Sequence, residues 1–278
     1  MIPAVLSKED LIEKIKDIFD AGWHKSVKST INKRNDGAVG NTLEKLLEIE
    51  ENNLPIPNAG EWELKGQRKH TSSLLTLKHI EPSPQAVGFV SNILLPLYGW
   101  KHKEAGRKYP VGEMSFRSTT RTTQYTKRGF KIIIDRENKK IRFVFNSTKV
   151  DMSDPEIRDW LLSVEKRIGL SPISPEPYWG FDDLKYAIGS KLKNCFYVIA
   201  DRKILEGHEY FRYERLLILT GFSFEKLLHC FDKGYAFVDF DARTGHNHGT
   251  KFRIRQDKIA DLYENVRIVD SRSPLTEK

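Results

Sequence analysis

The chain has 278 residues, enough for one large domain or two small ones with an ample core. A hydrophobic content of 39% and a charged content of 30% are typical of a soluble globular protein, and the formal net charge of +8 favours an anionic partner, nucleic acid first. No basic N-terminal region precedes a long apolar run, and no run approaches the roughly 18 apolar residues of a membrane span, so we expect neither secretion nor contact with a membrane.

The two cysteines point to a reducing compartment. Cys195 and Cys230 each lie within an apolar stretch. This placement predicts buried thiols, rather than a disulfide framework or a zinc site. We therefore expect the protein to work in the cytoplasm.

Helical periodicity dominates the first part of the chain. Apolar residues at helical spacing run from Ser7 to about Trp23, and Ser7 can cap this helix. A second helix is predicted from Asn41 to about Glu48. Its Glu44 stands among apolar positions, so we expect the carboxylate to point inward, either as an extra partner of a metal or lysine or in a structural ion pair.

The segment after this helix carries charged residues that a buried strand could hold only at a high cost in free energy. Residues 57–65 predict a turn and a short strand, with Glu61, Glu63 and Lys65 at a period of two and so on one face. Such charges are costly to bury unless they are paired or bound to a metal. A divalent cation that bridges the carboxylates to a phosphate would remove this cost, and the lysine could orient or deprotonate a water. The spacing resembles the PD-(D/E)XK nuclease motif, with Asn58 where the motif has its first metal-binding aspartate.

Strands are predicted through the middle of the chain. Residues 72–77 predict a second strand, and residues 131–146 predict a hairpin around Glu137 and Asn138. Residues 114–131 are rich in arginine and threonine with few acids, which suits phosphate contacts along a β-ribbon. An exposed polar hairpin is the alternative for that stretch.

Helices and strands alternate in the second half. The predicted helices are residues 154–168, 182–191 and 223–231, and the predicted strands are residues 194–200 and 209–219. Pro155 suits the first turn of the first of these helices. The continuous apolar run of residues 194–200 is typical of a central strand that is buried on both faces.

A flexible, charged stretch covers residues 239–255. Gly245 and Gly249 bracket a loop with His246 and His248, and charged and apolar residues alternate on both flanks. Arginine can bond guanine bidentately in the major groove and histidine can donate there, so we expect this stretch to read bases. A zinc site at the two histidines lacks a third ligand at a familiar spacing, and a charged hairpin tip is the other alternative.

These segments together resemble the MvaI/BcnI family of type II restriction endonucleases, relatives of the mismatch-repair nicking enzyme MutH. The resemblance is carried by residues 37–47 with their Gly-X-X-Leu-Glu pattern, by Glu51-Asn52-Asn53 and by residues 57–65. Residues 239–255 are also similar to the DNA-reading region of the family. The similarity spans about residues 35–265, which is most of the chain.

The resemblance implies an α/β fold, with a mixed α+β sheet and helices on both sides as the PD-(D/E)XK core. It also implies a second, DNA-recognition lobe, so that a monomer grips duplex DNA in a cleft. Within a single chain 1–278, we place the catalytic lobe at about residues 1–100 and 180–220. We place the recognition lobe at about residues 101–170 and 225–270.

The resemblance further implies Mg²⁺-dependent cleavage of double-stranded DNA at short pseudo-palindromic sites of the CC-N-GG kind, leaving a 5′-phosphate. Glu63 matches the metal-binding acid, Lys65 the water-orienting lysine and Glu44 the helical acid, while Asn58 and Glu61 complete the expected metal ligands. The residues expected to contact DNA are Arg68, Lys69, Arg117, Arg121, Asp241, Arg243, His246, His248, Lys251 and Arg253. A restriction role in a bacterial cell implies a cognate DNA methyltransferase as a functional partner.

Asn58 departs from the family pattern. An amide keeps one oxygen ligand but loses the charge that holds Mg²⁺ and helps to poise the water. Three accounts stay open: an introduced substitution that traps DNA uncut, a natural variant in which Glu61 supplies the charge, or a nuclease-like protein without activity.

Two other functions fit the same residues. A MutH-like nickase would cut one strand, and a non-catalytic DNA-binding protein would keep Glu63 and Lys65 only as an ion pair. An RNA-binding module is less compatible, because no RNP-type aromatic signature is present.

Overall fold

The computed structural model describes residues 7–28, 37–49, 57 and 59–270, which form two compact units. The first unit comprises Met1–Ser73, Ile188–Phe224 and Gln256–Lys278, and the second comprises Leu74–Ala187 and Glu225–Arg255. Each unit is thus assembled from stretches that lie far apart in the sequence.

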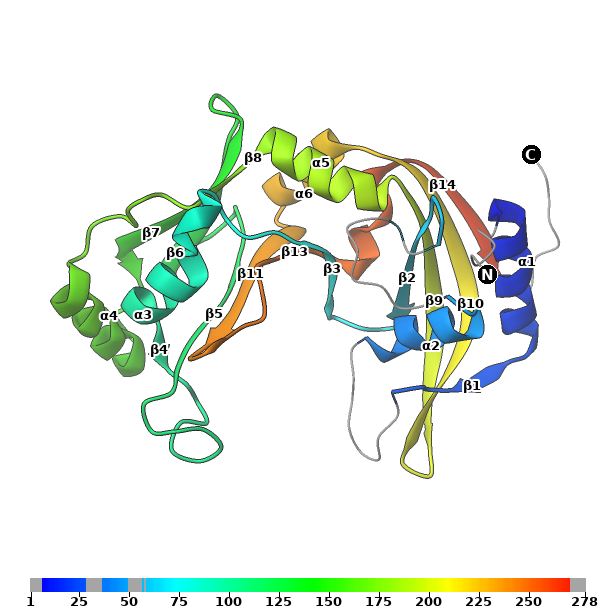
Figure 1. Cartoon of the computed structure of the whole chain (residues 1–278), viewed down its shortest axis with the longest axis horizontal. Helices are drawn as coiled ribbons and strands as arrows, with labels where there is room; N and C mark the ends of the chain where they lie inside the picture. The colour runs from blue at the N-terminus through cyan, green and yellow to red at the C-terminus, as the bar shows by residue number, and fades with distance from the viewer. Residues whose placement is uncertain (1–6, 29–36, 50–56, 58, 271–278) are drawn as a thin grey trace. The chain divides into compact units, whose positions relative to one another are not determined.

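The first unit is built on a five-stranded mixed sheet (Figure 1). Its elements are α1 (Lys8–Asp20), β1 (Trp23–Lys25), α2 (Ala38–Leu46), β2 (Glu63–Arg68), the end of α5 (Phe181–Leu192), β9 (Asn194–Leu205), β10 (His208–Phe222), the 3-10 helices Gln256–Lys258 and Ala260–Leu262, and β14 (Tyr263–Asp270). The strand order is β1-β10-β9-β2, and β14 also pairs with β10. β2 runs parallel to β9, whereas the other pairs are antiparallel. The predicted α/β class with a mixed sheet is confirmed.

The first helix follows its predicted cap. The Ser7 hydroxyl accepts a hydrogen bond from the Asp10 backbone N–H, and the Asp10 carboxylate accepts one from the Ser7 N–H, which closes a capping box. The helix ends at Asp20 rather than near Trp23. Gly22 takes a φ of +79° there, a conformation that favours glycine, and Trp23 already belongs to β1.

Helices α1 and α2 cover one face of this sheet (Figure 1). Apolar residues of both helices form a single core with Leu64 of β2 and with inward residues of β9 and β10. The approach of α2 to β2 is close, since a Cβ on Gly66 would lie 3.3 Å from the Cα of Gly40. Within this sheet β9 lies between β2 and β10, and its residues Cys195, Phe196, Tyr197 and Val198 are at most 1% exposed, which confirms the predicted central strand.

The second unit contains two antiparallel sheets. Its elements are β3 (Leu74–His79), the 3-10 helix Gln85–Val87, the π-helical turn Val90–Leu94, α3 (Leu95–Tyr98), β4 (Trp100–Lys101), β5 (Met114–Thr120), β6 (Arg128–Asp135), β7 (Lys140–Val150), α4 (Pro155–Ile168), β8 (Tyr178–Gly180), most of α5, α6 (Phe224–Asp232, from its second residue), β11 (Ala236–Arg243), β12 (His246–Asn247) and β13 (Lys251–Arg255). One sheet has the order β3-β13-β11-β5-β4, with β12 paired to β11, and the other has the order β6-β7-β8. Aromatic contacts such as Phe143–Phe240, with ring centroids 4.6 Å apart, join the two sheets in one core. The predicted hairpin of residues 131–146 is confirmed as β6 and β7.

The bounds of the units differ from those of the predicted lobes in three places, one of which is residues 180–187, predicted in the catalytic lobe and found in the second unit. Residues 74–100 belong to the second unit, because β3 pairs with β13. Residues 256–270 belong to the first unit, because β14 pairs with β10. The catalytic and DNA-recognition roles of the units stay predictions.

Candidate active site on strands β2 and β9

Glu63 and Lys65 lie on the same face of β2, two residues apart as the sequence predicts. Leu64 and Gly66, between and beyond them, face the helices α1 and α2, so the two charged side chains occupy the opposite face of the sheet. Parallel pairing with β9 places Glu63 opposite Cys195 in the register. The candidate site therefore rests on two strands, one of which is the buried centre of the sheet.

The carboxylate of Glu63 is almost completely enclosed, with the residue 2% exposed. The Lys65 Nζ lies 2.7 Å from Glu63 Oε1, and the Nζ of Lys191, from the end of α5, lies 3.6 Å from the same oxygen. Glu63 Oε2 is buried and has no hydrogen-bond partner among the described residues. One oxygen of this acid is thus held by cations while the other has none of the donors that a buried oxygen requires.

Neutral groups complete the surroundings of the acid. Burial raises the pKa of the Cys195 thiol to about 12, an effect that the Glu63 charge increases and the Lys65 charge opposes. Burial also raises the pKa of Tyr263 well above its ordinary value, with the neighbouring Cys195 and Glu63 adding to the effect. Both groups are therefore protonated near neutral pH, and neither supplies an anion beside Glu63.

The arrangement fits a hard divalent cation on a substrate rather than a closed protein cage. The described residues contain no cluster of three His, Cys, Asp or Glu that could hold a metal ion. Mg²⁺ commonly binds through one or two carboxylates together with substrate phosphates and water. The buried Oε2 of Glu63, which has no hydrogen-bond partner among the described residues, is a carboxylate ligand of that kind.

The predicted shared face for Glu61 is wrong. Ala59 and Trp62 exchange backbone hydrogen bonds of 2.9 and 3.0 Å and close a tight turn, and Glu61 sits exposed within it. β2 begins only at Glu63, so strand alternation does not extend back to Glu61. Asn58 and the segment Glu51-Asn52-Asn53 lie outside the described residues.

Glu44 lies apart from this group. It is half-buried on α2 and lines a cavity of about 370 Å³ together with Lys28, Lys45 and other residues of that region. Helix α2 packs on the face of the sheet opposite the Glu63 side chain. Within the described part of the chain, neither Glu63 nor Lys65 pairs with Glu44.

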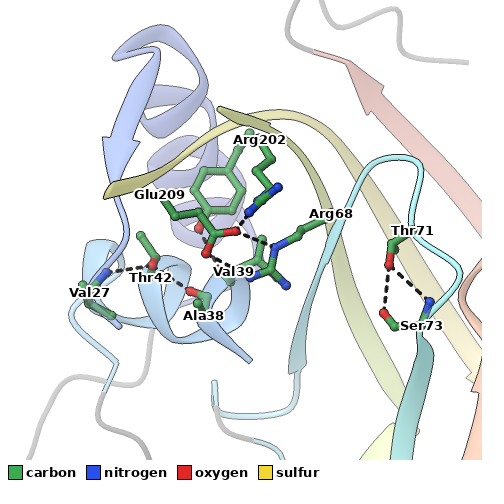
Figure 2. A network of polar contacts seen from close by, with 10 residues as sticks. Val27, Ala38, Val39, Thr42, Arg68, Thr71, Ser73, Arg202 and Glu209 are labelled. Atoms are coloured by element: carbon green, nitrogen blue, oxygen red, sulfur yellow. Dashed lines mark hydrogen bonds and ion pairs between the residues drawn. The ribbon is translucent and has the colours of Figure 1, made fainter. Parts of the chain in front are cut away.

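Arg68, at the end of β2, is buried rather than free for DNA. Figure 2 shows that its guanidinium and that of Arg202 converge on the carboxylate of Glu209. Arg68 Nε and Nη2 each donate to this carboxylate at 3.0 Å, and the residue is 6% exposed. This placement contradicts the predicted DNA contact, because the guanidinium is turned into the unit. Lys69, the next residue, is exposed and pairs with Glu214 at 3.3 Å, so its DNA contact stays a prediction.

Charged side chains of the stretch 239–255 gather on one face of the six-stranded sheet. In the register, Asp241 lies opposite Arg117, and it forms ion pairs with Arg117 at 2.8 Å and with Lys251 at 3.2 Å. Asp239, two residues earlier on the same strand, pairs with Arg253 at 2.9 Å. Burial opposes the ionisation of Asp241, yet the hydrogen bond from Lys251 and the charges of Lys251 and Arg117 outweigh it, so its pKa lies below its ordinary value.

The remaining predicted contacts in this unit are less uniform. Arg243 pairs with Glu113 at 3.1 Å and lies over the ring of Tyr109. His246 and His248 are exposed, with ring centroids 4.2 Å apart, and Arg121 is half-buried directly after β5. The described residues offer the two histidines no third zinc ligand.

Lys191 is the residue of the site that the sequence analysis missed. Its only local signal is a lysine in the last turn of a helix, which helix dipoles favour anywhere. Its place beside Glu63 depends on the parallel pairing of β2 with β9, between residues more than 130 positions apart in the sequence. Glu209, which holds Arg68 from 141 positions away in the sequence, was missed for the same reason.

The fold and this site are those of a restriction endonuclease. The family model of the MvaI/BcnI restriction endonuclease family matches residues 12–263, and the chain belongs to that family; it is a type II restriction endonuclease. The structure is similar to a solved complex of restriction endonuclease MvaI with its cognate DNA substrate, at 25% sequence identity and a TM-score of 0.72, covering 95% of this chain and 99% of that one. It is also similar to MvaI in the absence of DNA, at 24% identity and a TM-score of 0.49, covering 95% and 98%. Among curated proteins, none matches the chain.

In the described parts of the chain, no helix combines the length and the apolar character needed to cross a bilayer.

Proposed function

We propose that the protein hydrolyses phosphodiester bonds of double-stranded DNA at a short pseudo-palindromic site of the CC-N-GG kind, with Mg²⁺ as cofactor. The observation that carries the proposal is the Glu63 carboxylate, which Lys65 holds at 2.7 Å through one oxygen while the other is buried without a hydrogen-bond partner among the described residues. A buried carboxylate oxygen without a donor is costly, and a bound cation removes that cost.

Each residue of the pair has a role in this reaction. Glu63 would hold Mg²⁺ through Oε2, and Asn58 would contribute its amide oxygen. When bound, the ion would supply Lewis-acid chemistry, making water more acidic and neutralising charge on the phosphate. Lys65 orients the attacking water from the face that it shares with Glu63. Water adds to phosphorus as the bond to the 3′ oxygen breaks, which leaves the 5′-phosphate on the downstream fragment.

The second unit supplies base recognition in this proposal. Its charged face, defined by Arg117, Asp239, Asp241, Lys251 and Arg253, alternates cations with carboxylates that hold them in fixed geometry. Arginine and lysine match the acceptors of guanine, and a carboxylate matches the amino group of cytosine. The similarity to MvaI in complex with its cognate DNA substrate supports duplex DNA as the partner.

The experiment that tests the proposal is incubation of the protein and of its Asn58→Asp variant with unmethylated plasmid DNA and Mg²⁺. We expect discrete fragments from the Asn58→Asp variant at a rate that exceeds the parent by orders of magnitude, because an aspartate restores the charge that holds the ion. Sequencing of the ends gives the site and the cleavage position.

Other outcomes separate the alternatives. Relaxed circles without linear product would indicate a nickase that cuts one strand. Salt-sensitive DNA binding by both proteins, with cleavage by neither, would indicate a non-catalytic DNA-binding protein and would contradict the proposal. Equal cleavage by both would show that Asn58 is not the motif position.

Two further parts of the proposal concern partners. We propose that the protein acts as a monomer, and light scattering of the protein alone and with a duplex tests this directly. We also propose a cognate methyltransferase in the same system; DNA methylated at the sequenced site should then resist cleavage.

A further inference from the structure

Lys191 lies against Glu63 without a hydrogen bond of its own. Its Nζ is 3.6 Å from Glu63 Oε1, beyond hydrogen-bond distance, whereas Lys65 forms a close ion pair with that oxygen at 2.7 Å. The Lys191 side chain is only 17% exposed. An ammonium carries three donors, and in the described part of the chain none of those on Lys191 meets an acceptor at hydrogen-bond distance.

The charges at this point do not balance. Two ammonium groups, on Lys65 and Lys191, face the single carboxylate of Glu63, so the group carries one excess positive charge within a largely enclosed space. A structural ion pair would require only one lysine. Poorly satisfied donors and excess positive charge together call for an additional anion with acceptor oxygens.

The fold fixes Lys191 in this place. Ile188 and Leu192, three residues before it and one after, are both fully buried and anchor the last turn of α5. Favourable interaction with the helix dipole does not explain the position, because an exposed lysine in the last turn would obtain the same effect. The last turn of α5 instead holds the ammonium of Lys191 beside the carboxylate of Glu63.

We propose that Lys191 is a second catalytic lysine, which binds the phosphate that is cleaved while Lys65 orients the water. This inference rests on the proposed function. A phosphate oxygen supplies both the missing acceptor and the missing negative charge. The two lysines then have separate tasks, and Glu63 Oε1 keeps both near the reacting phosphorus.

The test compares Lys191→Met and Lys191→Arg with the control Lys193→Met, a change at an exposed lysine two residues further along. Each protein is titrated with duplexes that carry the four CC-N-GG sequences and with a duplex that lacks them, over a range of salt concentrations. Because binding releases counterions from each phosphate contacted, Lys191→Met should weaken binding about tenfold and reduce the slope of log affinity against log salt by about one. Lys191→Arg should retain most of the affinity, and Lys193→Met should match the parent.

Thermal unfolding distinguishes a phosphate contact from a structural role. We expect Lys191→Met to keep the melting temperature of the parent within a few degrees. Parent-like affinity and slope in Lys191→Met would overturn the inference, as would equal losses in Lys191→Met and Lys191→Arg together with a lowered melting temperature. A parent that binds none of the duplexes would instead contradict the proposed function itself.

Discussion

Glu63 and Cys195 are register partners across the parallel pair of β2 and β9, so the Glu63 carboxylate lies directly beside a buried thiol. Strand β9 is buried and apolar, and it pairs with β2, which lies at the edge of the sheet and carries the charged residues. The acid is therefore held in a fixed position by backbone pairing rather than by a loop.

The accessibility of the two buried thiols is a direct probe of the folded structure. Cys195 is fully buried with its pKa raised to about 12, and Cys230 is 1% exposed, so both lack the accessible thiolate that reacts with disulfide reagents. We expect the native protein to release almost no thionitrobenzoate from Ellman's reagent at pH 8. In guanidinium chloride it should release two equivalents, one for each cysteine. Rapid labelling of Cys195 in the native protein would show that the β2–β9 pair opens.

Glu63 and Lys65 should be separable from folding. Glu63→Gln and Lys65→Met are near-isosteric changes that remove one charge each, and we expect each to lower cleavage by the Asn58→Asp protein at least 100-fold. Lys193→Met, at an exposed lysine outside the predicted DNA contacts, is the matched control and should cleave normally. Initial rates on a plasmid substrate and melting curves of all variants measure both effects. Retained cleavage in Lys65→Met would exclude that lysine from catalysis.

The Arg68–Glu209 pair should be a stability element. Removing Arg68 leaves the carboxylate of Glu209, which is 4% exposed, with one fewer cation in a buried site. Breaking such a pair typically costs about 3–5 kcal/mol, so Arg68→Met should be strongly destabilised in urea titrations. Arg68→Met/Glu209→Leu should recover much of that loss, because neither charge then stays buried alone. Single and double variants with equal, small effects would contradict this role.

Asp241 should limit the electrostatic attraction of the second unit for DNA. The Asp241→Asn change removes the charge that Arg117 and Lys251 share, which leaves the face more positive. We expect tighter binding to duplexes that lack the site, a steeper salt dependence, and weaker discrimination between site and non-site DNA. Fluorescence anisotropy with a duplex that contains the site and one that lacks it measures the ratio of the two affinities. Unchanged discrimination would place Asp241 outside base recognition.

The same aspartate gives a pH dependence of defined sign. Because the pKa of Asp241 is lowered in the folded protein, its charge stabilises the fold above the pKa of the unfolded chain. That contribution should disappear as the pH falls through the lowered folded value. The difference in free energy of unfolding between the parent and Asp241→Asn should therefore be greatest near neutral pH and shrink in acid. Urea titrations at several pH values measure it, and a constant difference would contradict the assigned ion pairs.

The amino-acid sequence by itself determined the elements with local signals. The capping box at Ser7 and Asp10, the hairpin of residues 131–146 and the two-residue spacing of Glu63 and Lys65 all follow from neighbouring residues, and the structure contains each of them. The family resemblance was also present in short motifs, since their spacing is a property of the chain.

Only the tertiary structure decided which side of the sheet each charge occupies. Glu61 satisfied the same spacing argument as Glu63 and Lys65, yet the turn before the strand keeps it from their face. Glu44 lies on a helix that packs against the opposite face of the sheet. Arg68 resembled a DNA-binding arginine until Glu209, 141 residues away, was found to hold it in the interior. Lys191 reaches Glu63 only through the pairing of β2 with β9. Strand alternation and helical periodicity are local, whereas pairing between distant strands brings together charges whose positions no local pattern specifies.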